Sequence, residues 1–256
     1  MARTKPAHGT AMLAGLFAAG LLITAFAWVD VEWTHWLFVK DHAWFKKASS
    51  LDPQQLQKLR QSILNVRAVC DGGAEHSGTA FVVKPGYVAT AAHIFGEGQP
   101  CTGPVHLVDY KGLEHTATVE GLSPEDDLAL LKMSDETLPA LRLANAATYE
   151  TQNSVVRLVT IGYPLMQEGA SSRDSASISG EGSLSRYMRD QNVFVTSGLN
   201  VNPGNSGGPV FVRDDWTVLG IVRAKLPNTI GDGIGFIASI RAFETFFREK
   251  TGQELR

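Results

Sequence analysis

A glycine-rich turn around one serine is the part of this sequence best suited to chemistry. Residues 202–209 read Asn-Pro-Gly-Asn-Ser-Gly-Gly-Pro, which places Ser206 between Gly204 and Gly207. A serine nucleophile must stand on a tight turn beside free backbone N–H groups, and glycines permit such a turn because they carry no Cβ. A turn of this kind on its own is more often an ordinary loop, so Ser206 needs partner residues elsewhere in the chain.

The order of residues along the chain restricts what those partners can be. Gly204-x-Ser206-x-Gly208 also matches the nucleophile elbow of α/β-hydrolases, in which the histidine follows the serine. The last histidine here is His115, so that fold is excluded and the general base must lie upstream of the serine. The order histidine, aspartate, serine is the one that chymotrypsin-like enzymes use.

Three motifs in this order resemble the trypsin/chymotrypsin clan of serine peptidases. They are Thr90–His93, Asp127–Lys132 and Asn202–Pro209, and the likeness extends over roughly Ile63–Phe247. The sequence is most similar to the HtrA (high-temperature-requirement) group of that clan. The resemblance implies a serine endopeptidase that hydrolyses polypeptide substrates through an acyl-enzyme intermediate, with neither metal nor cofactor.

The resemblance also assigns a role to each residue of the site. His93 is the general base, Asp127 orients its imidazole, and Ser206 is the nucleophile. The backbone N–H groups of Gly204 and Ser206 form the expected oxyanion hole. A lone histidine more often packs in a core, and Asp126 is an alternative to Asp127. Asp127 is preferred because the family's aspartate directly precedes an aliphatic strand.

By the same resemblance, five residues line the pocket for the substrate residue before the cut: Asn200, Val201, Arg223, Ala224 and Lys225. Asn200 stands where trypsin is acidic, so a preference for Arg or Lys has no charge partner and a small or apolar residue is expected. Arg223 and Lys225 are unusual at these positions. They either accept an acidic side chain or face solvent.

Two other functions use the same fold. One is a catalytically silent trypsin-fold binding protein, and the other is an esterase with the same triad, because acyl-enzyme chemistry does not require an amide. The sequence ends about fifty residues after Ser206, so we expect no peptide-binding PDZ module. A net charge of −3 with scattered basic residues argues against nucleic-acid binding.

The composition and the spacing of apolar segments indicate an all-β protein. The 25 glycines and the short aliphatic runs favour many strands joined by turns. Two sets of six antiparallel strands, with no helices between them, predict two packed six-stranded β-barrels of the chymotrypsin-like kind. The predicted strands are 63–70, 79–83, 87–89, 105–108, 116–122 and 128–133, followed by 154–161, 176–187, 193–196, 209–212, 217–224 and 234–238.

These strands set the expected domain boundaries. Residues 63–250 form the peptidase domain, with barrel one at about 63–133, barrel two at about 152–239 and a C-terminal helix at about 240–250. Ser239 is the predicted N-cap of that helix. Residues 30–62 are predicted to be a stalk with a short helix from Pro53 to about Gln61, capped by Asp52.

The first 29 residues predict export. An uncharged run from Ala11 to Val29 follows Arg3 and Lys5, and at about 1.5 Å per residue a helix of that length nearly spans a bilayer. It is a signal anchor, or a signal peptide cleaved after Ala25-Phe26-Ala27. Both alternatives place the catalytic domain on the extracytoplasmic side, attached to the membrane or released.

Two cysteines, Cys70 and Cys101, are consistent with that location. A bridge closing their 31-residue loop is favoured over two buried free thiols, and it stabilises by roughly 3–4 kcal/mol in the chain-entropy model. A zinc site is not expected, because two cysteines without CxxC or HExxH spacing are a poor ligand set.

Overall fold

The structure is a computed structural model that describes residues 52–256 except 71–72, 97–100, 153–154, 165–175, 200 and 226–232, and only the backbone of 224–225. Gln54–Arg256 form one compact unit. The predicted span 11–29 and most of the predicted stalk lie outside the described residues. None of the helices in the described part of the chain is long and apolar enough to cross a membrane.

The first barrel closes from six antiparallel strands in the order β1-β2-β3-β6-β5-β4. Its interior holds a cluster of aliphatic side chains, such as Leu64, Val82 and Leu131, all fully buried. Closure pairs the outer strands β1 and β4, so the sheet has no exposed edge. The strands are β1 (Ile63–Val69), β2 (Glu75–Lys84), β3 (Tyr87–Thr90), β4 (Val105–Val108), β5 (Glu114–Ser123) and β6 (Leu128–Met133).

The second barrel repeats this plan in the order β10-β11-β12-β9-β8-β7. One apolar cluster fills it and continues to residues of the first barrel such as Phe81 and Leu128, so the two barrels share a core. The predicted pair of six-stranded barrels is confirmed. The strands are β7 (Arg157–Gly162), β8 (Ser177–Met188), β9 (Val193–Ser197), β10 (Pro209–Val212), β11 (Val218–Lys225) and β12 (Ile234–Ser239).

Some elements differ from the pattern-based expectation. Strand β2 begins at Glu75 rather than Thr79, because Glu75–Gly78 pair with β1 although they carry no apolar pattern. Three short helices in the described chain were not predicted, and the first of them carries His93. They are η1 (Ala92–Phe95), α3 (Ala146–Glu150) and η3 (Arg189–Gln191), whereas the helix α2 (Pro53–Arg60) was expected.

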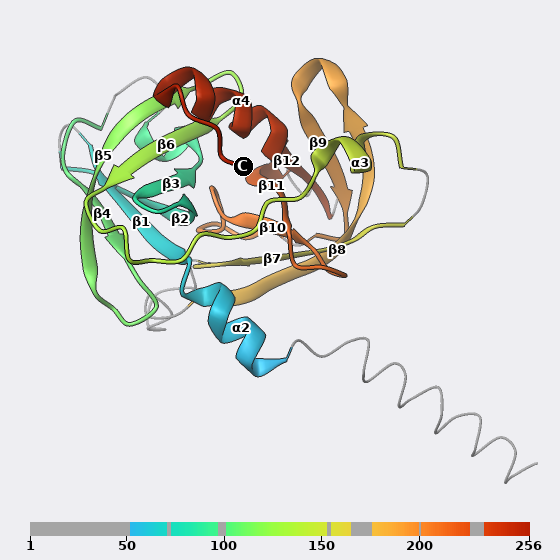
Figure 1. The fold of residues 1–256 in the computed structure, drawn as a ribbon, viewed down its shortest axis with the longest axis horizontal. Coiled ribbons are helices and arrows are strands. Elements are labelled where there is room, and N and C mark those ends of the chain that lie inside the picture. Colours follow the sequence, from blue (N-terminus) through green and yellow to red (C-terminus); the bar gives the residue numbers. More distant parts are fainter. Residues whose placement is uncertain are drawn as a thin grey trace, which may run out of the picture. The chain divides into compact units, whose positions relative to one another are not determined.

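The C-terminal helix α4 (Ile240–Thr251) ties the two barrels together. Ser239 caps it by accepting a hydrogen bond from the Arg241 N–H at 3.3 Å, as predicted. Figure 1 shows α4 in red beside strands of both barrels, and it contacts β5 as well as β11 and β12. Its buried Phe247 meets Tyr87 of β3 edge to face, with ring centroids 5.1 Å apart.

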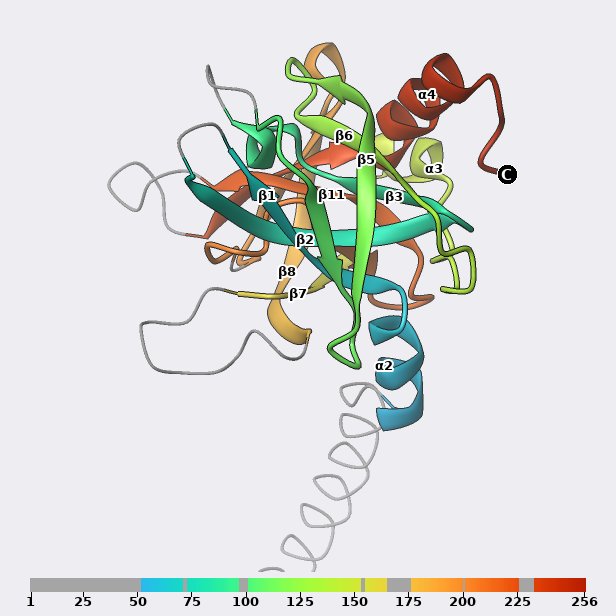
Figure 2. The same cartoon turned by 90° about the vertical axis from the view of Figure 1, so that its left-hand side faces the viewer.

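Seen from the side in Figure 2, the strands of the first barrel lie in front, and α2 leads into β1 at their lower end. The β1–β2 side of this barrel faces the second barrel, because β1 and β2 both contact β7. The junction between the barrels is therefore where side chains of both can meet.

Replacing Phe247 by alanine tests how far the α4 contact stabilises the fold. Removing a fully buried phenylalanine leaves a cavity, so we expect Phe247→Ala to lower the free energy of unfolding by about 3–5 kcal/mol. Thr245→Ala, at an exposed position of the same helix, is the control and should change it by less than about 0.5 kcal/mol. Denaturant unfolding followed by circular dichroism measures both; equal losses would contradict the role given to Phe247.

Candidate active site

His93 lies on a short helical turn directly after a buried strand. Strand β3 ends at Thr90, the backbone passes through the buried Ala91, and η1 then carries His93 at the surface of the first barrel. The Thr90 hydroxyl donates a 2.8 Å hydrogen bond to the Thr79 carbonyl, which fixes the end of the strand. The small residues before His93 are therefore required by close packing.

Asp127 pairs with this histidine. Its carboxylate accepts a 2.9 Å hydrogen bond from the His93 backbone N–H, and the ring Nδ1 lies 2.9 Å from Oδ2. The carboxylate is nearly buried, since Asp127 is 8% exposed. With Nδ1 directed at the carboxylate, Nε2 points away from it across the ring. Asp126 is engaged differently, because its carboxylate accepts the Ser123 hydroxyl at 3.3 Å.

The backbone around Asp127 is a strained turn. Its N–H donates to the Pro124 carbonyl at 3.3 Å, and its φ of 56° lies in the left-handed region. A non-glycine residue adopts this region only where its surroundings hold it there. The two bonds to His93 are part of what holds Asp127.

Thr79 of β2 binds the serine loop of the other barrel at two points. Its N–H donates to the Ser206 carbonyl at 2.8 Å, and its hydroxyl donates to the Gly204 carbonyl at 2.7 Å. The same hydroxyl accepts the Tyr163 N–H at 2.9 Å. Thr79 is fully buried, so none of these groups can exchange its partner for water. The first barrel thereby fixes the backbone on both sides of the serine.

Glycines allow the serine loop and the histidine turn to approach. A Cβ added to Gly207 would lie 2.1 Å from the Thr90 hydroxyl and 2.7 Å from the Ala91 nitrogen. A Cβ at Gly78 would lie 2.8 Å from the Ser206 carbonyl and 2.5 Å from the Ile94 side chain. The segments that carry Ser206 and His93 therefore pack against the same small residues.

The predicted oxyanion-hole groups have no internal hydrogen-bond acceptor among the described residues. Within the described chain, neither the Gly204 nor the Ser206 N–H donates a hydrogen bond, whereas Asn205, Gly207 and Gly208 donate theirs to the Asn202, Val222 and Asn205 carbonyls. Gly204 has a φ of 90°, which glycine adopts without strain. Two backbone donors beside the half-buried Ser206 could thus bind an anion.

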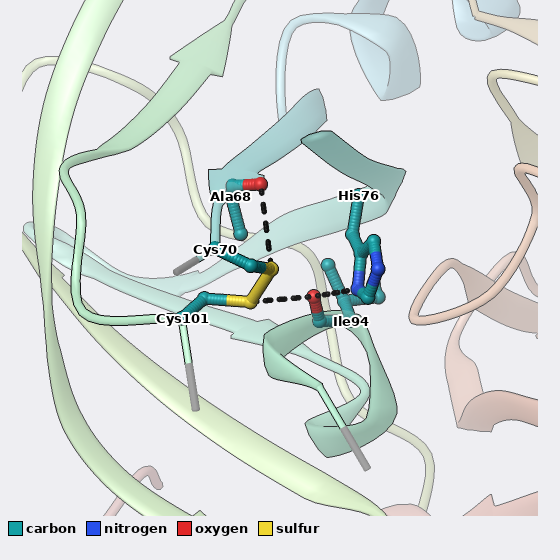
Figure 3. Close-up of a disulfide and its surroundings, with 5 residues drawn as sticks. All are labelled: Ala68, Cys70, His76, Ile94 and Cys101. Atoms are coloured by element: carbon teal, nitrogen blue, oxygen red, sulfur yellow. Dashed lines mark hydrogen bonds between the residues drawn. A yellow bond between two sulfur atoms is a disulfide. The ribbon is translucent and has the colours of Figure 1, made fainter. Parts of the chain in front are cut away.

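The predicted disulfide joins Cys70 and Cys101 and braces the histidine turn. Figure 3 shows the Ile94 carbonyl between the Cys101 sulfur and the His76 ring; the Cys101 Sγ lies 3.8 Å from this oxygen and the His76 Nδ1 3.2 Å. The Cys101 N–H also donates to the Phe95 carbonyl at 3.0 Å. The end of η1 is thereby tied to β1 and β2.

Cys70, His76 and Cys101 also form the one cluster among the described residues whose atoms could surround a metal ion. Both sulfurs are engaged in the disulfide, and a thiolate is the form of cysteine that binds metal. In the bridged state the cluster therefore offers only one imidazole, which already contacts the Ile94 carbonyl.

The structure describes some of the predicted pocket residues. Val201 is buried, and Arg223 on β11 donates a 2.9 Å hydrogen bond to the Glu125 carbonyl. The backbones of Ala224 and Lys225 pair with β12, while their side chains and all of Asn200 lie outside the described residues. The assignment of these five residues to the pocket remains a prediction.

Burial controls the ionisation of Tyr163, which joins the barrels. Removal from water raises the pKa of Tyr163 to about 12, so its hydroxyl stays protonated near neutral pH. The hydroxyl donates to the Ile63 carbonyl of β1 at 3.3 Å. This bond therefore persists over the physiological pH range.

Sequence reasoning did not identify Thr79 or the contact of Arg223. Thr79 follows Gly78 at the start of an apolar run, which is an unremarkable position for a strand residue. Its partners lie up to 127 positions away in the chain, so no local pattern could reveal them. The feature that marks Thr79 is a small polar side chain that is fully buried, and this burial is known only from the folded structure.

Comparison with known proteins identifies relatives of this arrangement. A family model described as a trypsin-like peptidase domain matches residues 78–221. A probable periplasmic serine endoprotease, DegP-like, of Chlamydia pneumoniae is 32% identical over 161 residues, covering 62% of this chain and 31% of the relative. The chain thus spans about a third of the length of the curated relatives it matches.

Two solved structures share the fold. The serine endoprotease from Yersinia pestis has a TM-score of 0.61 at 19% identity, covering 80% of this chain and 69% of that one. The HtrA-type protease AlgW with tripeptide also has a TM-score of 0.61, at 23% identity, covering 77% and 63%. At such low identities these likenesses show the fold alone.

Two glycines with nearly the same φ angle test the packing of the serine loop. Gly207 has a φ of 79° and no room for a Cβ, whereas Gly112 has a φ of 78° and nothing within 4 Å. Alanine at either site should cost about 1–2 kcal/mol for the left-handed conformation. Gly207→Ala should cost about 1–3 kcal/mol more because the added methyl overlaps β2 and β3. Equal unfolding free energies for the two variants would contradict the described packing.

Thr79→Val tests the hydroxyl that joins the barrels. Valine preserves the shape but leaves the Gly204 carbonyl and the Tyr163 N–H buried without this partner, at about 1–3 kcal/mol for each group. We expect a loss of roughly 2–6 kcal/mol in unfolding free energy, measured by denaturant titration. Thr79→Ser keeps the hydroxyl and should cost only about 1 kcal/mol. A valine variant that is no less stable than the serine variant would contradict the role given to the hydroxyl.

Proposed function

The chain belongs to the trypsin-like peptidase family, and from this premise we propose that it is a serine endopeptidase with His93, Asp127 and Ser206 as its triad. The observation that carries the proposal is the pairing of His93 Nδ1 with the nearly buried Asp127 carboxylate, at 2.9 Å. Two further features support it: the loop of Ser206 packs against the strand end before His93, and two backbone donors stand beside the serine.

The chemistry begins with transfer of a proton. His93 Nε2 accepts the proton of the Ser206 hydroxyl while the Ser206 oxygen attacks the carbonyl carbon of the peptide. The imidazolium then protonates the leaving amine, and the acyl-enzyme remains. A water molecule, deprotonated by the same imidazole, attacks the acyl carbon, and the imidazolium returns the proton to the Ser206 oxygen as the acid product leaves. Asp127 acts throughout by holding the ring tautomer and stabilising the imidazolium charge.

The backbone supplies the other part of the catalysis. Negative charge develops on the carbonyl oxygen in the transition state, and the N–H groups of Gly204 and Ser206, which donate no hydrogen bond within the described chain, are the proposed donors to it. Thr79 and Gly207 hold the loop that carries these donors. One such donor typically contributes about 3 kcal/mol to transition-state stabilisation. The donors are fixed before substrate arrives, so little reorganisation is needed.

We also propose an extracytoplasmic location and polypeptide substrates. A relative named a probable periplasmic serine endoprotease supports both, and the disulfide agrees with an oxidising compartment. The run from Ala11 to Val29 is the proposed export signal or membrane anchor. For the substrate residue before the cut, the absence of an acidic residue at Asn200 favours a small or apolar side chain.

Substitution of the triad provides the main test. Ser206→Ala or His93→Ala should lower kcat by several orders of magnitude, roughly 10⁶ as in another serine protease, because either change removes the activated nucleophile. Asp127→Asn should lower it by about 10⁴, since the wrong histidine tautomer is then held. Cleavage of a quenched fluorescent peptide library measures each variant and also reports the preferred substrate residue.

The neighbouring aspartate gives a matched control. Asp126 bonds to Ser123 and lies one residue from Asp127, so Asp126→Asn should retain near-normal turnover. Labelling with a fluorophosphonate probe distinguishes an activated serine from a silent binding fold, and simple esters tested beside the peptides distinguish an esterase. Peptide cleavage that survives Ser206→Ala would refute the proposal.

A further inference from the structure

The side chain of Arg223 reaches from the second barrel to the turn that carries Asp127. Arg223 lies on β11, and one N–H of its guanidinium donates a 2.9 Å hydrogen bond to the carbonyl of Glu125. The two residues are 98 positions apart in the chain. Glu125 stands two positions before Asp127, inside the tight turn closed by the Pro124 carbonyl and the Asp127 N–H.

This turn needs support from outside itself. Asp127 is held in a left-handed conformation with a φ of 56°, which an aspartate adopts at a cost. Within the turn, the Pro124 bond is long at 3.3 Å and the Ser123–Asp126 contact is also 3.3 Å. The Glu125 carbonyl belongs to the peptide unit before Asp126, so its direction sets how the chain enters Asp127. Arg223 is well suited to fix it, because a charged donor makes a stronger hydrogen bond than a neutral one.

The same arginine is next to the loop of the nucleophile. Val222, one residue earlier on β11, accepts the Gly207 N–H and donates to the Gly208 carbonyl, both at 2.9 Å. Two adjacent residues of one strand therefore contact the serine loop and the aspartate turn. A shift of β11 would be transmitted to both.

We propose that Arg223 is a positioning residue, which clamps the Asp127 turn to β11 and keeps the aspartate aligned with His93. The proposal rests on the proposed peptidase function, since it assigns Asp127 to the triad. It gives Arg223 a use other than direct recognition of an acidic substrate residue. The guanidinium acts through the backbone of Glu125 and contacts no reacting atom.

The test removes the guanidinium donor and keeps an unbranched, uncharged side chain in its place. In Arg223→Met we expect kcat for peptide cleavage to fall by about 10- to 100-fold, because a displacement of about 1 Å in a catalytic group has this effect. KM should stay within about twofold, since the clamp does not bind substrate. Arg223→Lys, which keeps a charged donor, should recover part of the lost kcat.

A second arginine provides the matched control. The guanidinium of Arg142 also donates a hydrogen bond to a backbone carbonyl, that of Asp215. Asp215 lies just before the start of β11, whereas Arg223 lies near the end of this strand. Arg142→Met removes the same kind of bond away from the Asp127 turn and should leave kcat near the wild-type value. A fluorophosphonate should label Arg223→Met more slowly than the wild type but to the same final extent. The equal final extent would show that the variant is folded.

Peptides with an acidic or a neutral residue before the cut separate the clamp from substrate recognition. The clamp requires the same fold-loss of kcat for both peptides. A loss confined to the acidic peptide and expressed in KM would overturn it, as would wild-type kcat in Arg223→Met. Neither result contradicts the proposed peptidase function. That function is contradicted by a wild-type chain without activity or by activity retained in Ser206→Ala.

Discussion

The hydrogen bonds of Thr79 to the serine loop are the interaction on which the rest of the site depends. The proposed triad is divided between two barrels, so the relative position of its histidine and serine depends on how the barrels pack together. Thr79 belongs to the first barrel, yet its N–H and hydroxyl bind the carbonyls on either side of Asn205 in the second. Because Thr79 is fully buried, the contact has a defined geometry and a large cost of breaking.

This constraint explains the small residues at the junction. Gly78, Ala91 and Gly207 surround the contact, and a side chain at either glycine would overlap backbone atoms of the opposite segment. The hydrogen bonds can form at 2.7–2.8 Å only because no side chain separates the strands there. At Gly78 the requirement is steric, and at Gly207 the left-handed backbone, with a φ of 79°, adds a second reason for glycine.

The sequence predicts a large part of this architecture, but not the contacts between the barrels. All twelve strands in the described barrels were predicted from β-type runs bounded by turn residues. Cys70 and Cys101 were correctly paired because there are only two cysteines. The start of β2 at Glu75 was missed because its polar residues have no apolar pattern. Thr79 and Arg223 act through partners about 100 positions away, which periodicity and local propensity cannot reveal.

The division between barrels also determines how the site can fail. Each barrel closes on its own hydrogen-bonded ladder, whereas the contacts between them are fewer: Thr79 with the serine loop, Tyr163 with Ile63, Arg223 with the Asp127 turn, Phe247 with Tyr87 and a shared apolar core. Proteins open in contiguous cooperative units whose stabilities differ. In the proposed site, a small relative displacement of the barrels would separate the nucleophile Ser206 from the base His93 while both ladders stayed intact. Activity should therefore be more sensitive to changes at this junction than secondary structure is, because catalysis requires alignment within a fraction of an ångström and strand pairing within one barrel does not.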